Sequence, residues 1–142
     1  MIVEEATEVS PELIEAFGRL TGQLSRSAPP PGEHELRHIV DSDSTRLLIA
    51  KVDGVIGGSL TLVLFRIPTG VRAMIEDVVV DEALRGRGIG EALSREALSV
   101  AEGHGARTVD LTSRPSREGA NRLYQRIGFK LRETNVYRYS FD

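Results

Sequence analysis

The sequence contains no cysteine among its 142 residues. Disulfides, thiolate catalysis and cysteine-based zinc or iron–sulfur sites are therefore excluded. The sequence also lacks an apolar run near the ~18 residues that a membrane-spanning helix needs. Its acidic first residues, 1–5, do not have the pattern of a signal peptide. We therefore expect a cytoplasmic protein with no membrane partner.

A strong net charge is absent as well. The formal net charge is −3, which disfavours binding to nucleic acid. The charge is unevenly spread, because residues 1–70 carry six basic and ten acidic side chains, whereas residues 104–132 carry seven basic and two acidic ones. The basic segment suits a small polyanionic ligand, and the alternative is a solvated basic face.

The hydrophobic pattern predicts one domain over residues 1–142, in which strands and helices are mixed. The expected element order is β-α-α-β-β-β-α-β-α-β-β, beginning with a short N-terminal strand. The later strands are expected at 45–52, 55–66, 71–80, 107–112, 129–132 and 135–141, and the helices at 10–21, 32–40, 89–102 and 117–126. This order predicts the α/β (α+β mixed) class, with helices packed on a mixed sheet.

A glycine-rich turn at residues 85–90, Arg-Gly-Arg-Gly-Ile-Gly, lies between an expected buried strand and an expected helix. Such a turn exposes backbone N–H groups at the positive end of the helix, and glycine lets an anion come close. We therefore expect a phosphorylated ligand. A Walker A motif would need a Gly-Lys pair that is missing, and the dinucleotide motif would need a third glycine where Leu93 stands. The pattern that fits is Arg-x-x-Gly-x-Gly.

Two motifs at this spacing resemble those of the GNAT acetyltransferase superfamily. The first joins the strand 75–80 to the glycine turn, and the second is the run 120–129, Ala-Asn-Arg-Leu-Tyr-Gln-Arg-Ile-Gly-Phe. The element order also agrees, so the resemblance covers effectively the whole chain. It implies the GNAT acyltransferase fold, with a central mixed, mostly antiparallel sheet of about six to seven strands and helices on both faces.

The resemblance implies acetyl-CoA as acyl donor, no metal, and direct transfer of the acetyl group to a primary amine of a small molecule or peptide. The amides of the glycine turn would hold the pyrophosphate, and the backbone of the preceding strand would bind the pantetheine arm. An asparagine on a later helix would contact the cofactor near the pantetheine. The cofactor-binding residues expected on this basis are Val78, Val79, Val80, Arg85, Gly86, Arg87, Gly88, Ile89, Gly90 and Asn121.

The resemblance also implies two catalytic residues. Tyr124 matches the tyrosine that protonates the leaving CoA thiolate, and it shares a helix face with Asn121 because the two are three positions apart. Glu76 is the candidate general base, acting directly or through water, because it precedes the cofactor-binding stretch of the strand. The alternative for Glu76 is a strand-face carboxylate that pairs with Arg72 or another arginine.

Other readings of the chain stay open beside this one. The run 34–38, His-Glu-Leu-Arg-His, satisfies the zinc-hydrolase pattern His-Glu-x-x-His, but the match is short and a third ligand is poorly supplied. The alternative to an enzyme is a catalytically silent CoA-binding module that regulates or scaffolds. The resemblance further raises the expectation of a homodimer formed through the C-terminal strands.

Overall fold

The computed structural model describes residues 1–141, and the chain divides into two compact units, Met1–Thr112 and the segment that begins at Ser113. The element order confirms the expected alternation up to the last helix. The elements are β1 (Ile2–Glu5), α1 (Pro11–Leu24), α2 (Glu33–Asp41), β2 (Thr45–Val52), β3 (Val55–Ile67), β4 (Gly70–Val80), the 3₁₀ turn η1 (Glu82–Leu84), α3 (Ile89–Gly103), β5 (Thr108–Asp110) and α4 (Glu118–Ile127).

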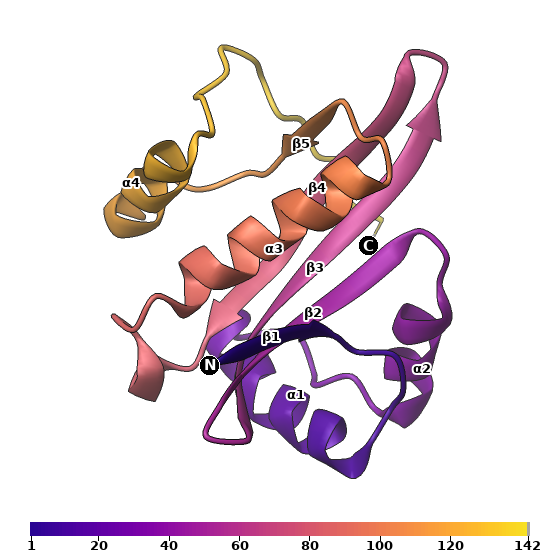
Figure 1. The fold of residues 1–142 in the computed structure, drawn as a ribbon, viewed down its shortest axis with the longest axis vertical. Coiled ribbons are helices and arrows are strands. Elements are labelled where there is room, and N and C mark those ends of the chain that lie inside the picture. Colours follow the sequence, from indigo (N-terminus) through magenta and orange to yellow (C-terminus); the bar gives the residue numbers. More distant parts are fainter. Residues whose placement is uncertain (142) are drawn as a thin grey trace. The chain divides into compact units, whose positions relative to one another are not determined.

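The sheet belongs entirely to the first unit and runs in the order β1-β2-β3-β4-β5 (Figure 1). The first four strands pair antiparallel, and β5 pairs parallel with β4. Short turns join the antiparallel strands, with Asp53 and Gly54 both at positive φ between β2 and β3, as expected of a hairpin turn. The parallel pair is connected through η1 and α3. The sheet is therefore mixed and mostly antiparallel, as predicted.

Helices cover both faces of this sheet. Successive side chains of a strand point to opposite faces, and each face packs against a different helix. Leu47 and Ile49 belong to a core cluster that also contains Leu13 and Leu20 of α1. On the other face, α3 packs so closely on β3 that a Cβ placed on Gly58 would lie 2.9 Å from a methyl carbon of Ile89. Gly58 therefore brings the first turn of α3 against the sheet.

The first helix begins as its sequence predicts. The Ser10 hydroxyl accepts the N–H of Leu13 at 3.1 Å, and Pro11 occupies the first helical position. Along α1, the buried side chains of Leu13, Ala16 and Leu20 recur at helical spacing and face the sheet. This packing fixes α1 beneath β3 and β4.

The number of strands is lower than predicted, since residues 1–141 contain five. The strands expected at 129–132 and 135–141 do not form. The residues there have strand propensity, but a strand needs a hydrogen-bonded neighbour, and large side chains such as Leu131 (90% exposed) and Phe141 (94% exposed) are not packed. The helix expected from Arg117 begins one residue later, and no side chain caps its start.

Candidate functional site

The outer edge of β4 is open over more than half of the strand. Within the described chain, β5 pairs with Arg72, Ala73 and Met74, and no strand pairs with β4 on that side from Ile75 onward. On its other side, β4 is paired with β3 from one end to the other. The strand is therefore ordered by β3 while backbone groups of its second half face away from the sheet.

A β-bulge determines which backbone groups of β4 face the open edge. Glu76 pairs with Thr61 and Val79 pairs with Ser59, so two residues of β4 stand opposite one residue of β3. Asp77, the first residue of the bulge, has a φ of 49°, a left-handed conformation that non-glycine residues rarely adopt. Simple strand alternation therefore does not hold across Asp77.

The hydrogen bonds on either side give the direction of the backbone. Before the bulge, the Val71 carbonyl accepts the Arg107 N–H at 3.0 Å, so odd-numbered residues face the β5 side. After the bulge, the Asp81 N–H donates to the Gly57 carbonyl on β3 at 2.8 Å. Because successive residues alternate, the backbone groups of Val78 and Val80 face the open edge, and those of Val79 face β3.

After β4 and the short turn η1, the glycine turn leads into α3. Gly86 and Gly88 have φ values of 83° and 78°, which favour glycine because a side chain would be strained there. Gly88 is the N-cap residue of α3 and brings no side-chain oxygen to that helix end. The first amides of α3 are therefore not capped by a side chain, as an anion site at a helix N-terminus requires.

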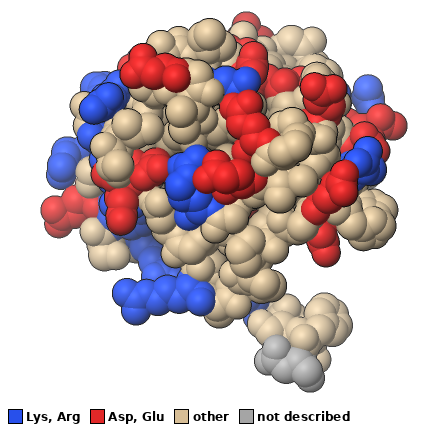
Figure 2. Space-filling view, turned by 90° about the horizontal axis from the view of Figure 1, so that it is seen from below, with Lys and Arg blue, Asp and Glu red and all other residues tan. Residues whose placement is uncertain are grey.

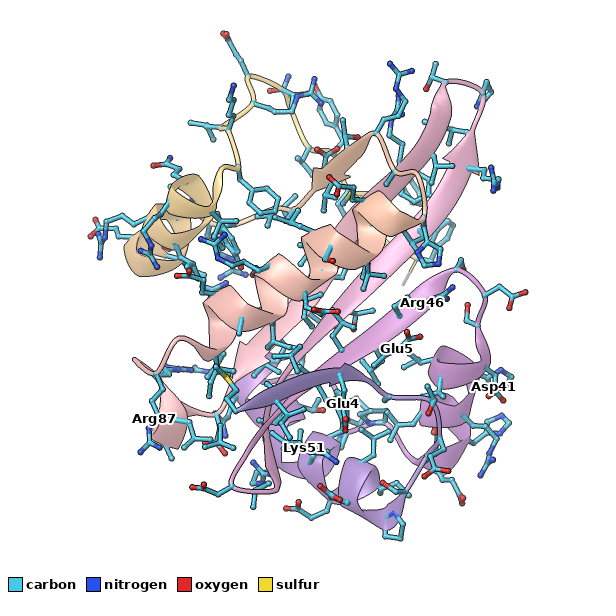
Figure 3. All side chains as sticks on the ribbon, viewed as in Figure 1. Glu4, Glu5, Asp41, Arg46, Lys51 and Arg87 are labelled. Carbon is cyan, nitrogen blue, oxygen red and sulfur yellow. The ribbon has the colours of Figure 1, made fainter. Side chains whose placement is uncertain are left out.

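Two arginines stand in this turn. Arg85 and Arg87 are both exposed, and Figure 3 shows Arg87 pointing outward from the turn. Guanidinium groups beside uncapped amides add positive potential to the helix dipole. The predicted pyrophosphate-binding segment, 85–90, thus has the backbone conformation and the charge that an anion needs.

Glu76 lies on β4 on the same face as Val79, since both stand opposite odd-numbered residues of β3. Its side chain is exposed. Among residues 1–141, Glu76 forms no ion pair with Arg72 or with another arginine. Arg72 donates to the Thr69 hydroxyl at 2.9 Å and to the Val71 carbonyl at 3.4 Å. A base role for Glu76 stays a prediction.

The second unit carries the other predicted residues on α4. Asn121 donates from Nδ2 to the Arg114 carbonyl at 2.9 Å, which fastens the helix to the turn before it. Tyr124 lies one helical turn further along and is 7% exposed. Its ring meets that of Phe129 edge-on at a centroid distance of 5.8 Å. Gly128 ends the helix at a φ of 125°, a conformation that favours glycine.

Burial changes the acidity of Tyr124. Loss of solvation raises the pKa of its phenol above the ordinary value, and the positive charge of Arg117 offsets part of that rise. The phenol is therefore fully protonated at neutral pH. A protonated hydroxyl is what a general acid must present to its substrate.

The His-Glu-x-x-His run has a structural explanation. Glu35 accepts the Gly32 N–H at 3.0 Å and so closes the start of α2. His34 and His38 stack edge-on with ring centroids 4.6 Å apart. Among residues 1–141, no group of three or more histidine, aspartate and glutamate side chains is arranged to hold a metal ion.

A hollow of about 190 Å³ lies apart from the open edge, beside β1 and the start of α1. Lys51 lines it and reaches Glu4 at 3.1 Å (Figure 3). The Glu12 carboxylate lies 3.9 Å from the same ammonium. The hydrogen bond that Lys51 donates to Glu4, helped by the nearby Glu12 carboxylate, raises the pKa of Lys51. Figure 2 shows cations and carboxylates interspersed over this side of the molecule. These ion pairs tie β1 to β2 and to α1.

Sequence reasoning missed three residues that support η1, namely Arg19, Gln23 and Asp81. Arg19 donates to Asp81 at 2.7 Å, and Gln23 accepts the Glu82 N–H at 2.8 Å. These contacts join residues about sixty positions apart, so no local pattern announces them. The spacing of Arg19 and Gln23, one helical turn apart on α1, is the one signal that they share a face.

Comparisons with known proteins agree with this geometry. The family model described as "Acetyltransferase (GNAT) family" matches residues 11–129. The chain is 34% identical to a glucosamine 6-phosphate N-acetyltransferase of Trypanosoma brucei brucei, in an alignment that covers 94% of this chain and 90% of that protein.

Two solved structures are similar over almost the full length. An acetyltransferase of Trypanosoma brucei is 26% identical with a TM-score of 0.75, and the match covers 98% of this chain and 100% of that one. An aminoglycoside acetyltransferase from an uncultured soil metagenomic sample has a TM-score of 0.85 at 19% identity, over 99% of this chain and 95% of that one, and shows the fold alone. None of the helices in residues 1–141 has the length and apolar character to cross a bilayer.

Proposed function

The chain belongs to the GNAT acetyltransferase family, and from that premise we propose that it moves the acetyl group of acetyl-CoA directly to a primary amine. The open edge of β4 is the observation that carries this proposal. It presents the backbone of Val78 and Val80, and it leads through η1 into the glycine turn. A linear ligand that combines amide groups with a pyrophosphate matches that sequence of features.

Acetyl-CoA, which GNAT acetyltransferases use, is such a ligand. In this proposal, its pantetheine amides pair with Val78 and Val80 as a short strand would, and Val79 keeps the strand in place through β3. The amides of residues 85–90 receive the pyrophosphate, and Asn121 contacts the cofactor near the pantetheine. No metal takes part in this chemistry.

The transfer proceeds directly from the thioester to the amine, and a thioester intermediate on the enzyme is impossible because the chain has no cysteine. The amine nitrogen attacks the thioester carbon, and the C–S bond breaks as the tetrahedral intermediate collapses. Glu76, directly or through a water molecule, takes the proton that the nitrogen loses. Tyr124 donates its proton toward the sulfur as the bond breaks. The sulfur leaves as the CoA thiol, and the Tyr124 phenolate then recovers a proton from solvent. Because a phenol is a weaker acid than a thiol, the proton moves while the C–S bond is breaking.

For the acceptor, we propose a small-molecule amine, with a peptide amine as the second choice. The relative from Trypanosoma brucei brucei is named for glucosamine 6-phosphate and is 34% identical over most of the chain. A phosphorylated amino sugar is therefore the first acceptor to assay.

Substituting Tyr124→Phe tests the chemistry, because it removes the hydroxyl and keeps the buried ring. We expect kcat to fall by about 10²-fold or more, while the Kd for CoA, measured by calorimetry, does not change. Asn121→Ala should show the opposite pattern, with weaker CoA binding. An unchanged kcat in Tyr124→Phe would remove this residue from the mechanism.

The second candidate function is a CoA-binding module without turnover. Thermal unfolding separates binding from catalysis. Acetyl-CoA at about 100 times its Kd adds about 2.7 kcal/mol, which should raise the Tm by roughly 5 to 11 °C, whereas ATP and NAD should not. Binding without CoA release from any amine would favour the silent module.

A homodimer is also part of the proposal. The segment 129–141 has strand propensity, exposes large apolar side chains including Tyr137 (88%) and Tyr139 (84%), and has no strand partner within the described chain. Exposed segments of this kind are typical of interfaces. Sedimentation should give a dimer, and Tyr139→Lys should weaken it. A monomer at all concentrations would contradict this part.

A further inference from the structure

The turn η1 joins the end of β4 to the glycine turn, and α1 holds it from one side. Arg19 Nη1 donates to Asp81 Oδ2 at 2.7 Å. One helical turn later, Gln23 Oε1 accepts the backbone N–H of Glu82 at 2.8 Å. Two side chains of one helix therefore fasten two consecutive residues at the start of η1.

The strand β3 holds η1 from the other side. The Asp81 N–H donates to the Gly57 carbonyl at 2.8 Å. The side chain of Leu84 occupies the space that a Cβ on Gly57 would need. Asp81 Oδ1 also accepts the Ala83 N–H at 3.1 Å, which closes the turn itself. The entry to the glycine turn is thus fixed at several independent points.

The Arg19–Asp81 pair differs from the surface ion pairs of this chain. The side chains are 30% and 16% exposed, and Arg19 Nη2 donates in addition to the Ile56 carbonyl at 3.0 Å. The Ala83 N–H, followed by Gln23 and Arg19, holds the pKa of Asp81 below its ordinary value. Partial burial and shared hydrogen bonds make such a pair less sensitive to salt than an exposed one.

The glycine turn depends on this support. Its two positive-φ glycines give it wide conformational freedom, and its residues 85–88 are exposed. Amides stabilise an anion strongly when they are already aimed at it before it binds. The C-terminal end of the turn is held by α3, which is packed on the sheet. The conformation of the turn therefore depends on the position of η1 at its other end.

We propose that Arg19 is a positioning residue for cofactor binding, acting through Asp81 and assisted by Gln23, by setting the path of η1 and so the aim of the amides at 85–90. This inference rests on the proposed function, in which those amides receive the pyrophosphate of acetyl-CoA. Arg19 itself does not touch the cofactor. It lies on α1, and its guanidinium contacts Glu15, Ile56 and Asp81.

The test measures the Kd for CoA by calorimetry at a temperature well below the Tm of every variant. Arg19→Met keeps most of the side-chain volume and removes the donors. We expect it to raise the Kd for CoA on the order of tenfold, and Arg19→Lys to raise it less. Glu15→Gln is the matched control, since it removes an exposed partner of Arg19 (64% exposed) and keeps the bond to Asp81. Its Kd should equal that of the wild type.

A double-mutant cycle shows whether the effect passes through Asp81. Asp81→Asn keeps an oxygen for the Ala83 N–H and removes the charge that Arg19 meets. If Arg19 acts through Asp81, Arg19→Met combined with Asp81→Asn binds CoA no more weakly than the weaker single variant. Additive losses would overturn the proposal, and so would a lower Tm with an unchanged Kd. Failure of the wild type to bind CoA would overturn the proposed function instead.

Discussion

The two halves of β4 form one strand but have different surroundings. In the first half, residues 70–74, the stretch 72–74 lies between β3 and β5, and Ala73 is 1% exposed. Residues 75–80 pair with β3 alone and contain a bulge at Asp77. The first half satisfies its backbone within the sheet, whereas the second half keeps groups available on one edge.

This difference shows how a sheet can bind a ligand without losing order. A strand without a paired neighbour would be mobile, and a strand paired on both edges would have no backbone N–H or C=O group available for a ligand. In β4, one edge provides stability and the other provides hydrogen-bonding groups. The bulge then selects Val78 and Val80 as the residues that face outward. We therefore expect substitutions in the first half to affect folding and those in the second half to affect binding.

A matched pair of proline substitutions should give the largest contrast. Ala73→Pro removes an N–H that faces β5 inside the sheet, and we expect the free energy of unfolding to fall by about 1–3 kcal/mol. Val80→Pro removes an N–H at the open edge, where proline is tolerated. Its stability should stay near that of the wild type while the Kd for CoA rises roughly tenfold.

Urea unfolding and calorimetry measure the two effects separately. The comparison fails if both variants lose stability equally, or if Val80→Pro binds CoA as the wild type does. The first result would mean that the Val80 N–H is already hydrogen-bonded within the protein. The second would mean that CoA does not use the backbone there.

Substitutions at the bulge should have a smaller effect. Asp77→Val forces a β-branched residue into a left-handed conformation, which costs about 1–2 kcal/mol. This cost favours a regular β4 in which the bulge is lost. Shedding it would turn Val78 and Val80 toward β3 and weaken CoA binding. Asp77→Gly is the control, because glycine adopts this conformation freely and should bind CoA normally. Equal CoA affinity in both variants would show that the bulge does not orient the backbone groups of Val78 and Val80 for CoA binding.

The smallest expected effect is the pH dependence of stability that Asp81 causes, just after the second half of β4. The pKa of Asp81 is lower in the folded chain than in the unfolded chain, so its ionised form stabilises the fold above roughly pH 3.9. That contribution, about 1 kcal/mol, is lost as the pH falls through the folded-state pKa. Asp81→Asn should therefore be less stable than the wild type at neutral pH, and the gap should close in acid. A gap that is constant from neutral to acid pH would contradict this assignment.

Sequence patterns predicted the features that depend on neighbouring residues. The strand 45–52 and the start of α3 at Ile89 follow from local hydrophobic spacing and the glycine turn. The placement of Tyr124 and Asn121 on one helix followed from their spacing. The role of each of these two residues stays a prediction.

The features that sequence reasoning missed depend on distant partners. The bulge at Asp77 is defined by register against Ser59 and Thr61, and a charged Glu-Asp pair inside an apolar run was its one local sign. The contact of Arg19 with Asp81 joins two elements through the fold. Segment 129–141 was expected to pair because its composition suits a strand, but composition does not supply a neighbour.

Hydrogen exchange of individual amides, with and without CoA, tests the central claim most directly. We predict that CoA slows exchange at Val78, Val80 and the amides of the glycine turn, and that Ala73, already bonded within the sheet, does not change. Protection confined to the glycine turn, with exchange at Val78 and Val80 unaffected, would contradict the claim that the open half of β4 binds the cofactor.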